Sequence, residues 1–347
     1  MNSKIENLLR LSCSISCWII GIILIPIICT AEVIHSPIEP PEIEAPKIAT
    51  PLQAKIGVFI NDIYGFDLRN QSFNVVFWAW FVYPTSDNYK PEKSTEVVNA
   101  YAYTKNDSFA GVRKNNLSWS SLKFVGKVTH QWKVTNFPFD SQKLQIILED
   151  MELDYSDLQY VVDQQNSKAS PSIHLPDWKI VNFDLQVTPF VYPTTYGDPD
   201  VKSGDRTYAR ATVSISLERE STVKLFFNTF LALYVAFTLS ALAFLIPINN
   251  NAPRLSLATG GVFAVVANKY ALDTMLPLTT SITLVDKLQI FTLIFISISA
   301  LTSVILIHLD SQHRESAKAV NKFVGILFLV SYIVFNVYWI FDAMKHT

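Results

Sequence analysis

Two kinds of hydrophobic pattern divide the chain near residue 221. From residue 56 to residue 220, short runs rich in Val, Ile, Phe, Tyr and Trp are separated by clusters of Asn, Asp, Pro, Ser and Gly, a pattern typical of antiparallel sheets. In the segment 212–217 apolar and polar residues alternate strictly, which predicts a strand with one buried and one wet face. We therefore predict an all-β immunoglobulin-like sandwich over residues 56–220.

Beyond residue 221 the apolar residues form four long runs. The run 225–246 contains no charged side chain, and a run of this length can cross a hydrocarbon layer of about 30 Å as a helix. We therefore predict an all-α four-helix transmembrane bundle over residues 221–347. Its helices are expected at about 225–246, 254–276, 286–308 and 319–343.

The first residues carry the pattern of an export signal. Lys4 and Arg10 precede a mostly apolar run over residues 11–28, and small side chains follow at residues 29–31. This pattern predicts a signal peptide over residues 1–31 that is removed on export. An uncleaved anchor helix is the alternative, because the apolar run nearly reaches the ~18 residues that span a bilayer. Residues 32–55 are rich in proline, which predicts an extended arm without a core of its own.

Composition narrows the choice of partners and chemistry. The 347 residues carry a formal net charge of -2, and only 17% of them are charged, so neither a nucleic-acid binder nor an acidic tail is indicated. All three cysteines lie in the predicted leader, which leaves the mature chain without a disulfide or a cysteine metal site. The sequence has no nucleophile elbow, phosphate loop or zinc-binding helix motif. We therefore expect no enzyme activity, no cofactor and no bound metal.

Charges between the predicted helices indicate an orientation. The first and third connections carry more Lys and Arg than Asp and Glu, as cytoplasmic loops do. The second connection, residues 277–286, has no basic residue. We predict a multi-pass protein of the inner cell membrane, with the β domain and the C-terminus outside the cytoplasm. Tyr338 and Trp339 are expected at the membrane–water interface.

Several short motifs occur in an order that is known from one protein family. They are residues 137–142 (FPFDSQ), 254–257 (RLSL), 276–277 (LP) and 335–339 (FNVYW), with Arg219 just before the first helix. In this order the chain resembles the Cys-loop receptor superfamily of pentameric ligand-gated ion channels, and its prokaryotic members in particular. The resemblance implies a homopentamer in membrane lipid, in which a small-molecule agonist or protons open a pore for permeant ions. The second helix of each subunit would line that pore.

The chain also departs from the family pattern. His130 and Leu144 stand where the two bridging cysteines of the family would fall, and the connection between the third and fourth helices is short. Both departures are usual in bacterial members. The first helix lacks the mid-helix proline common in animal receptors, and the second helix is atypical. A non-conducting membrane receptor of the same fold is therefore the alternative function.

A stripe of residues runs along the second predicted helix. Steps of three and four residues place small, hydroxyl-bearing and aromatic side chains on one helix face. The resemblance implies that this face lines the pore, with a ring of Phe263 side chains as the gate, because a hydrophobic constriction can close a pore by dewetting. The alternative is an ordinary packed helix, whose small residues let its neighbours approach. The predicted pore-lining residues are Ser256, Thr259 at the flank of the stripe, Gly260, Phe263, Ala267, Tyr270 and Thr274.

Ionisable residues lie near both ends of this helix. Lys269 and Asp273 are four residues apart, which predicts an ion pair directed toward a neighbouring helix. Asp273 can attract cations at the outer mouth of a pore, whereas Arg254 can favour anions at the inner mouth. The usual behaviour of bacterial relatives favours cations.

The resemblance also implies a coupling interface at the base of the β domain. Asp140 and Arg219 match family positions that meet there, and Asp67 falls on a loop that reaches the same place. We predict an ion pair between Asp140 and Arg219, because a carboxylate and a guanidinium can bond bidentately. A surface pair without a signalling role is the alternative. A turn of this interface is expected to press on the loop between the second and third helices. The predicted coupling residues are Asp67, Pro138, Phe139, Asp140 and Arg219.

Aromatic residues in the long hairpin before the last strand are candidates for an agonist site. The resemblance places this site between subunits. Phe190, Tyr192 and Tyr196 can offer ring faces to a cationic amine, with Tyr155 opposite. Protons are the other candidate stimulus, since a histidine such as His130 titrates near neutral pH.

Overall fold

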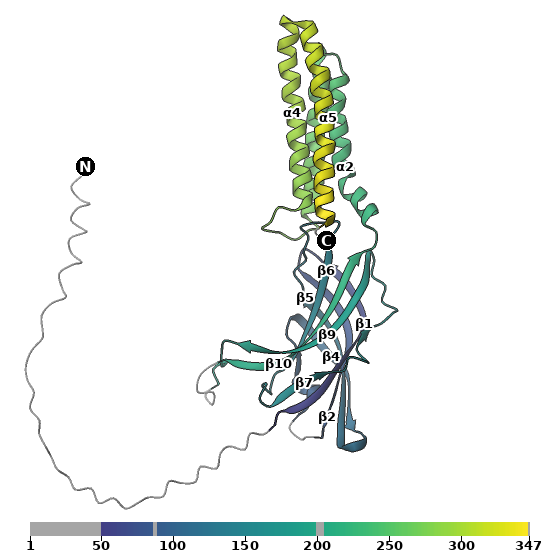
Figure 1. Cartoon of the computed structure of the whole chain (residues 1–347), viewed down its shortest axis with the longest axis vertical. Helices are drawn as coiled ribbons and strands as arrows, with labels where there is room; N and C mark the ends of the chain where they lie inside the picture. The colour runs from purple at the N-terminus through teal and green to yellow at the C-terminus, as the bar shows by residue number, and fades with distance from the viewer. Residues whose placement is uncertain (1–49, 86–88, 199–204, 346–347) are drawn as a thin grey trace, which may run out of the picture. The chain divides into compact units, whose positions relative to one another are not determined.

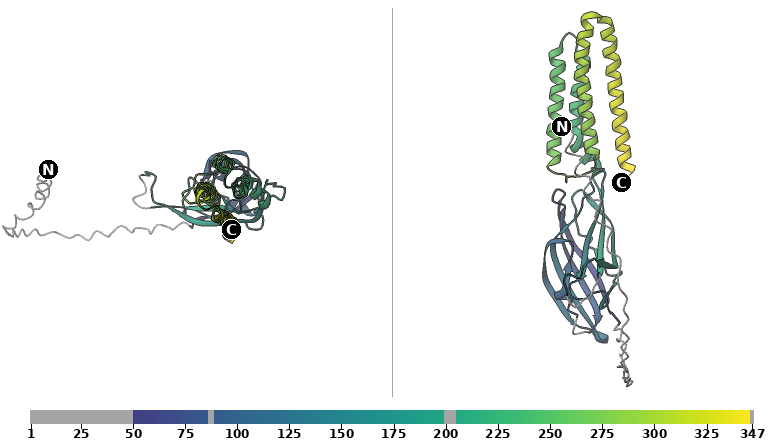
Figure 2. Two further views of the ribbon diagram at one scale, coloured as in Figure 1. Left: turned by 90° about the horizontal axis from the view of Figure 1, so that it is seen from above. Right: turned by 90° about the vertical axis from the view of Figure 1, so that its left-hand side faces the viewer.

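The computed structural model of the chain describes residues 50–85, 89–198 and 205–345. Strands occupy the first part of this range and long helices the second (Figures 1 and 2). The predicted leader and most of the predicted arm lie outside the described residues. The end of the arm belongs to the first strand, β1 (Leu52–Asp67), so the β part begins before the predicted residue 56.

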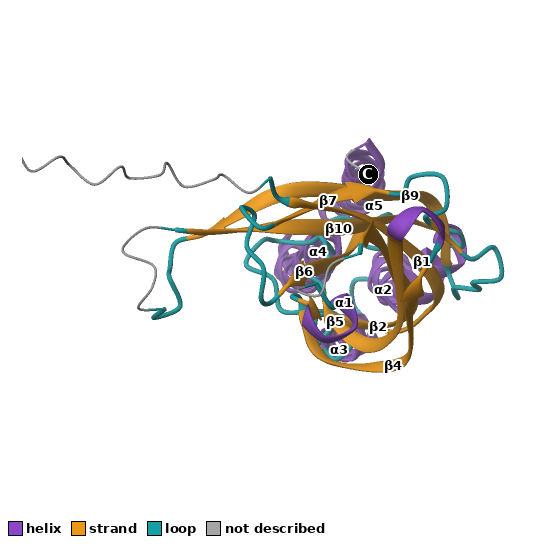
Figure 3. Ribbon diagram, turned by 90° about the horizontal axis from the view of Figure 1, so that it is seen from below, coloured by secondary structure: helices purple, strands orange, loops and turns teal. Residues whose placement is uncertain are grey.

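The strands form two sheets (Figure 3). The larger sheet has the strand order β4-β5-β2-β1-β7, and the short strand β8 also pairs with β1. Strands β7 and β8 run parallel to β1, whereas the other pairings are antiparallel. Besides β1, the strands of this sheet are β2 (Ser72–Pro84), β4 (Ala100–Val112), β5 (Leu117–Thr129), β7 (Leu158–Val162) and β8 (Lys168–Ala169).

The smaller sheet has the order β3-β6-β10-β9 and is antiparallel at every pairing. The buried face predicted for residues 212–217 is confirmed, because Val213, Ile215 and Leu217 are fully buried, but the other face is not fully wet, since Ser214 is buried as well. Each such side chain contributes about 1.5–3 kcal/mol when it leaves water. The strands of this sheet are β3 (Thr95–Val97), β6 (Ser141–Asp150), β9 (Trp178–Tyr192) and β10 (Arg206–Arg219), and the short helices α1 (Pro91–Ser94) and η1 (Lys114–Asn116) precede β3 and β5.

Side chains of both sheets share one buried hydrophobic cluster. Phe77 of the larger sheet belongs to it together with Leu144 and Ile215 of the smaller sheet. At one point of the larger sheet the indole of Trp80 lies directly over Gly57, where a Cβ atom would collide with the ring. Only glycine therefore fits beneath this indole. The same cluster continues into residues of the helices, so strands and helices share a continuous apolar core.

Within the described residues, four helices are long and apolar enough to cross a membrane. A mostly β region followed by four apolar helices is therefore confirmed. Each helix begins two to five residues before its predicted first residue. The helices are α2 (Thr222–Leu242), extended by η2 (Ala243–Leu245), α3 (Asn251–Asp273), α4 (Leu284–Gln312) and α5 (Arg314–Lys345).

The four helices do not pack equivalently. Helix α3 packs against α2 and α4, whereas α5 packs mainly against α4 and to a smaller extent against α2. Aromatic rings fill the α2–α4–α5 contact: Phe237 stacks on Tyr332 with ring centroids 3.5 Å apart, and Phe295 and Phe328 join them. The hydroxyl of Tyr332 lies 2.9 Å from that of Thr292, which satisfies both groups in an apolar surrounding. This arrangement leaves one face of α3 uncovered by the other helices of the chain.

Candidate functional site

All seven predicted pore-lining residues are exposed in the single chain. Phe263 is 69% exposed and Tyr270 is 75% exposed, which is unusual for aromatic side chains in the middle of a protein helix. The opposite face of α3 is buried against its neighbours, with Ala258 and Val265 among its members. The exposed set Ser256, Thr259, Gly260, Phe263, Ala267, Tyr270 and Thr274 is called the α3 stripe below.

The hydroxyl groups of the α3 stripe point their protons at the helix backbone. Ser256 donates to the carbonyl oxygen of Ala252 at 2.8 Å, and Thr259 donates to that of Leu255 at 2.9 Å. Because each hydroxyl proton is used within the helix, the oxygen lone pairs remain to accept hydrogen bonds or to face a cation. The part of the stripe near the start of α3 therefore presents acceptor oxygens outward.

Adjacent glycines on α3 have different surroundings. A Cβ atom on Gly261 would lie 3.1 Å from the carbonyl oxygen of Ala236 and 3.2 Å from Ile296, whereas one on Gly260 would meet nothing within 4 Å. Gly261 thus permits the close approach of α2 and α4. Gly260 has no packing role within the described residues, and it instead creates open space on the α3 stripe.

Near the end of α3, Lys269 forms the predicted pair with Asp273, with the ammonium 3.2 Å from the carboxylate. The structure adds a second partner, since Asp286 of α4 lies 3.4 Å from the same ammonium. Asp286 also caps α4 reciprocally with Thr283, as in a capping box. The capping signal Thr-x-x-Asp is visible in the sequence, but the contact with Lys269 depends on how α3 and α4 pack.

The structure corrects the expectation that Arg254 faces an inner pore mouth. Arg254 is fully buried, and its guanidinium donates to Asn321 of α5 at 2.7 Å and to the carbonyl oxygen of Ile246 at 3.4 Å. The start of α5 covers it because a single residue, His313, joins α4 to α5. Within residues 50–85, 89–198 and 205–345, no carboxylate pairs with Arg254. The residue therefore fastens α3 to α5.

The predicted ion pair at the base of the strands is present and buried. Arg219 at the end of β10 donates to both carboxylate oxygens of Asp140, at 2.6 and 3.3 Å. The side chains of Asp140 and Arg219 are 1% and 8% exposed, so this is not a surface pair. The guanidinium also lies 4.1 Å from the ring of Trp178, and Gln142 donates to Asp140 at 2.7 Å. Both charges thus have a full set of partners.

Asp67 takes no direct part in this pair. Its carboxylate accepts hydrogen bonds from Asn70, and these bonds lower the pKa of Asp67. Its backbone carbonyl accepts from the indole of Trp132 at 3.1 Å. Trp132 lies 6.4 Å from Trp178, the ring that Arg219 covers. Asp67 is therefore linked to the ion pair indirectly, through the indole rings of Trp132 and Trp178.

Contacts between the strands and the helices come from neighbouring loops. Phe139 lies 5.9 Å from Phe226 of α2, and the preceding peptide at Pro138 is cis. The loop between α3 and α4 is held by the amide of Leu284, which donates to the carbonyl of Thr135 at 2.8 Å. A contact of Pro138 and Phe139 with this loop stays a prediction.

The predicted agonist residues are only partly gathered. Tyr192 lies next to Phe190 and Tyr196, with ring centroids 4.8 and 5.8 Å away. Tyr155 instead bonds through its backbone amide to Thr207, and its ring packs on the buried core. Three of the four predicted residues therefore form one aromatic group.

Sequence reasoning missed the arginine in this group. The guanidinium of Arg210 lies 3.2 Å from the centroid of Phe190, pairs with Glu149 and donates to the hydroxyl of Tyr192. Tyr192 in turn donates to Glu149 at 2.8 Å. Burial and the adjacent Glu149 carboxylate raise the pKa of Tyr192 to about 12. The ring face of Phe190 that could bind a cationic ligand is therefore already covered by Arg210.

Beside this group lies an acidic surface pocket of about 550 Å³. Four carboxylates and three tyrosines contribute to its walls, with Arg206 as the one basic lining residue among the described residues. Burial, followed by the charge of Glu149, raises the pKa of Glu96. The acidic and tyrosine side chains that line it are Glu96, Glu149, Asp150, Asp198, Tyr192, Tyr196 and Tyr208.

Comparison with known proteins gives no further information about this arrangement. No protein family matches the sequence, and no curated protein matches it either.

Proposed function

We propose that the chain is one subunit of a homopentameric ligand-gated ion channel of the Cys-loop receptor type. In this proposal the two sheets are an immunoglobulin-like sandwich outside the inner membrane, and the α3 stripes of five subunits surround the pore. The helix ends beside the first and third connections would face the cytoplasm, because there Arg254, Arg314, Lys318 and Lys322 outnumber Asp310 and Glu315.

One observation carries the proposal: the most exposed membrane helix is also the least apolar. Among the four helices, α3 has the lowest mean hydropathy and the smallest buried fraction. A helix with hydroxyls and a lysine on its uncovered side is poorly matched to lipid, because hydrocarbon cannot solvate these groups. Facing a water-filled axis between subunits satisfies them. A symmetric ring places every copy of α3 in that position.

Phe263 is the proposed gate. On the α3 stripe its large apolar ring stands between Gly260 and Ala267, both small. Five such rings at one level would form a narrow apolar belt with wider levels above and below it. A belt of this kind excludes water and ions without any charged barrier.

The charges around the α3 stripe favour cations. Asp273 is exposed near the end of α3, while the charge of Lys269 is shared between two carboxylates. Arg254 is buried away from the stripe. The exposed Asp273 carboxylate would draw cations to the outer mouth, against the positive charge of Arg69, which donates to the carbonyl oxygen of Thr274 at 3.4 Å.

Coupling between the sandwich and the pore is assigned to Asp140 and Arg219. Arg219 ends β10 and precedes α2 by two residues, so a shift of the strand moves the start of the helix. Removing one partner of a buried pair costs about 3–5 kcal/mol, because the other charge stays buried. Arg219→Ala should abolish gating or assembly, whereas Arg219→Lys should retain part of it. Unchanged ligand-gated currents in Arg219→Ala would disprove this role.

The acidic surface pocket beside Tyr192, called the acidic tyrosine pocket below, is the proposed agonist site. Its carboxylates and the rings of Tyr192, Tyr196 and Tyr208 suit an organic amine, in place of the Phe190 face that Arg210 covers. Protons are the alternative stimulus. Because its pKa is raised, Glu96 accepts a proton at a higher pH than an ordinary glutamate does.

The decisive test counts subunits and then measures current. Native mass spectrometry of the detergent-purified mature protein should give five copies, and the same preparation in a planar bilayer should pass cations in a salt gradient. A stable monomer or dimer would overturn the channel proposal. Five copies without current under amines or acid would favour the non-conducting receptor, in which the rings of Phe263 and Tyr270 close the axis permanently.

A further inference from the structure

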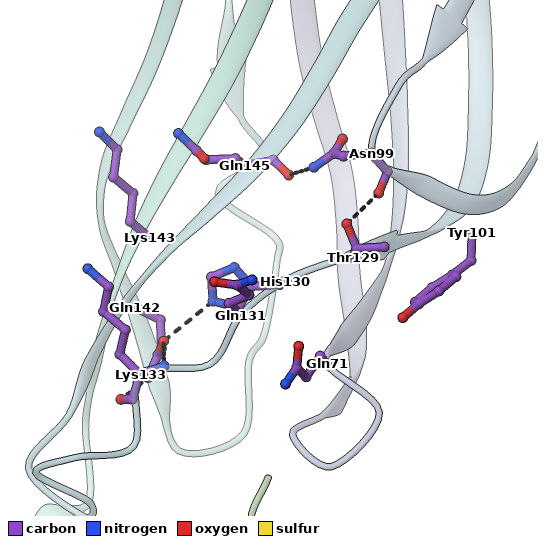
Figure 4. A pocket seen from close by; sticks show the side chains of 10 residues that line it. All are labelled: Gln71, Asn99, Tyr101, Thr129, His130, Gln131, Lys133, Gln142, Lys143 and Gln145. Carbon is purple, nitrogen blue, oxygen red and sulfur yellow. Dashed lines mark hydrogen bonds between the residues drawn. The ribbon is translucent and has the colours of Figure 1, made fainter. Parts of the chain in front are cut away.

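A second surface pocket, of about 580 Å³, is lined in part by Gln142 (Figure 4), which also donates to Asp140 of the buried ion pair. Its walls come from the end of β5, the segment that follows it, the start of β4 and β6. Pockets of this size hold small organic molecules. Amide, ammonium and hydroxyl groups dominate the lining, which consists of Gln71, Asn99, Tyr101, Thr129, His130, Gln131, Lys133, Gln142, Lys143 and Gln145.

The pocket carries positive charge on one side. Lys133 and Lys143 lie together along one wall in Figure 4, and no acidic residue lines the pocket. Among the described residues neither lysine forms an ion pair. Charges of one sign in a concave surface focus their field and attract a counter-ion. The charged side chains that line this pocket are therefore basic, whereas most of those that line the acidic tyrosine pocket are acidic.

The facing wall offers neutral hydrogen-bonding groups. Asn99 and Thr129 stand across the pocket from the lysines, with Tyr101 beyond them (Figure 4). Asn99 is held in place, since its side-chain nitrogen donates to the backbone carbonyl of Gln145 at 2.9 Å and its side-chain oxygen accepts from the amide of Ile147 at 3.0 Å. Its backbone carbonyl accepts from the hydroxyl of Thr129 at 2.9 Å. Fixed amide and hydroxyl groups are the partners that a hydroxylated molecule needs for orientation.

Gln142 forms the rear wall and is rigid. Its side-chain oxygen accepts from the amide of Lys133 at 3.1 Å and lies 3.4 Å from the ring nitrogen of His130. Its side-chain nitrogen donates to the carbonyl of Lys133 and to the carboxylate of Asp140. The pocket and the Asp140–Arg219 pair therefore share one side chain.

We propose that this pocket binds a small hydroxylated carboxylate, such as a sugar acid. Lys133 and Lys143 hold the carboxylate, while the amides and Thr129 accept and donate bonds to its hydroxyls. The volume exceeds what a single inorganic anion fills and suits a small organic molecule. Through Gln142, occupancy tightens or loosens the Asp140–Arg219 pair. This last step rests on the proposed channel function, but the binding itself does not.

The test measures binding to the full-length protein in detergent by isothermal titration calorimetry at constant ionic strength. The probes are D-gluconate, D-glucose as its neutral counterpart, and inorganic phosphate. We expect saturable binding of gluconate, and at least tenfold weaker binding of glucose and of phosphate. Equal affinity for glucose would overturn charge recognition, a preference for phosphate would overturn the carboxylate assignment, and no gluconate binding at millimolar concentration would overturn the site.

Matched variants locate the site. The double variant Lys133→Gln/Lys143→Gln should weaken gluconate binding at least tenfold, whereas Lys168→Gln, which removes an exposed lysine of β8 outside the pocket, should leave it unchanged. Thr129→Val should weaken gluconate without altering its preference over glucose. Unchanged binding in the double variant would refute the proposal whatever the subunit count or conductance proves to be. Circular dichroism identifies variants that fail to fold.

Discussion

The uncovered faces of α3 and α5 differ in chemistry although both belong to membrane helices. On α5 the residues from 323 to 341 include no charged side chain, and Leu327, Val330 and Val334 are about half exposed or more. The α3 stripe has a comparable exposure but mixes hydroxyls, glycine, alanine and two aromatic rings. Lipid can solvate the α5 face completely, whereas it offers no partner to the acceptor oxygens that Ser256 and Thr259 present outward once their protons are bonded within the helix. A helix face that is exposed in the single chain can therefore contact either lipid or water, and the composition of the face indicates which.

The largest expected difference comes from inserting a charge at mid-membrane. Val330→Asp on α5 should cost about 2.5–3.5 kcal/mol in membrane insertion, because the carboxylate meets hydrocarbon. Thr259→Asp on the α3 stripe should cost much less, because water reaches it. The yield of assembled protein on size-exclusion chromatography measures both. Equal losses would show that the two faces see the same surroundings.

Cysteine modification tests the same difference without adding a charge. The three native cysteines lie in the predicted leader, so the mature chain offers a thiol-free background. Ala267→Cys should react with a water-soluble thiosulfonate on the order of a hundredfold faster than Leu327→Cys, because the thiolate that reacts forms only in water. Mass spectrometry of labelled membranes gives the rates. Similar rates would place both faces in lipid, or both in water.

Truncation of the proposed gate sharpens the comparison to one residue. Phe263→Ala should raise the current without agonist at least tenfold, which corresponds to about 1.4 kcal/mol of lost closed-state preference. Leu327→Ala truncates an exposed apolar side chain of the α5 face to the same methyl group and should leave this current unchanged. Bilayer recordings of both variants decide the matter. A silent Phe263→Ala channel, with the pentamer intact, would remove Phe263 as the gate.

The smallest effect separates the two sides of α3 itself. Gly260→Ala should stabilise the helix by about 0.5–1 kcal/mol, because alanine has the better helix propensity and its methyl meets open space. Gly261→Ala should lose this gain, since the methyl presses on Ala236 and Ile296. Thermal unfolding followed by tryptophan fluorescence measures the shift in Tm. Equal shifts would mean that α2 and α4 do not approach α3 as closely as described.

Local patterns predicted the parts of the molecule that depend on local physics. The buried face of β10 and the apolar runs of the four helices are properties of one segment each, and both are confirmed. The exposed stripe of α3 likewise follows from helical periodicity. The Asp140–Arg219 pair joins residues 79 positions apart, and only the family resemblance made it predictable.

Features that depend on packing between segments were missed or placed wrongly. Arg254 is charged and stands at the start of the predicted second helix, but α5 helps to bury it. Arg210 lies on β10 diagonally from Phe190 of β9, whose register partner is Tyr208, and no spacing rule places its guanidinium on that ring. Asp286 meets Lys269 because α3 and α4 are neighbours. Each case required the tertiary arrangement.

The turns at the far end of the helices have a consequence for signalling. Residues 246–250 join η2 to α3, and His313 alone joins α4 to α5. Neither connection offers the surface area that a stable protein partner needs, which is about 800 Å² on each side. In the proposed channel, a signal received by the sheets would therefore pass on as a flow of ions or as a change of helix position.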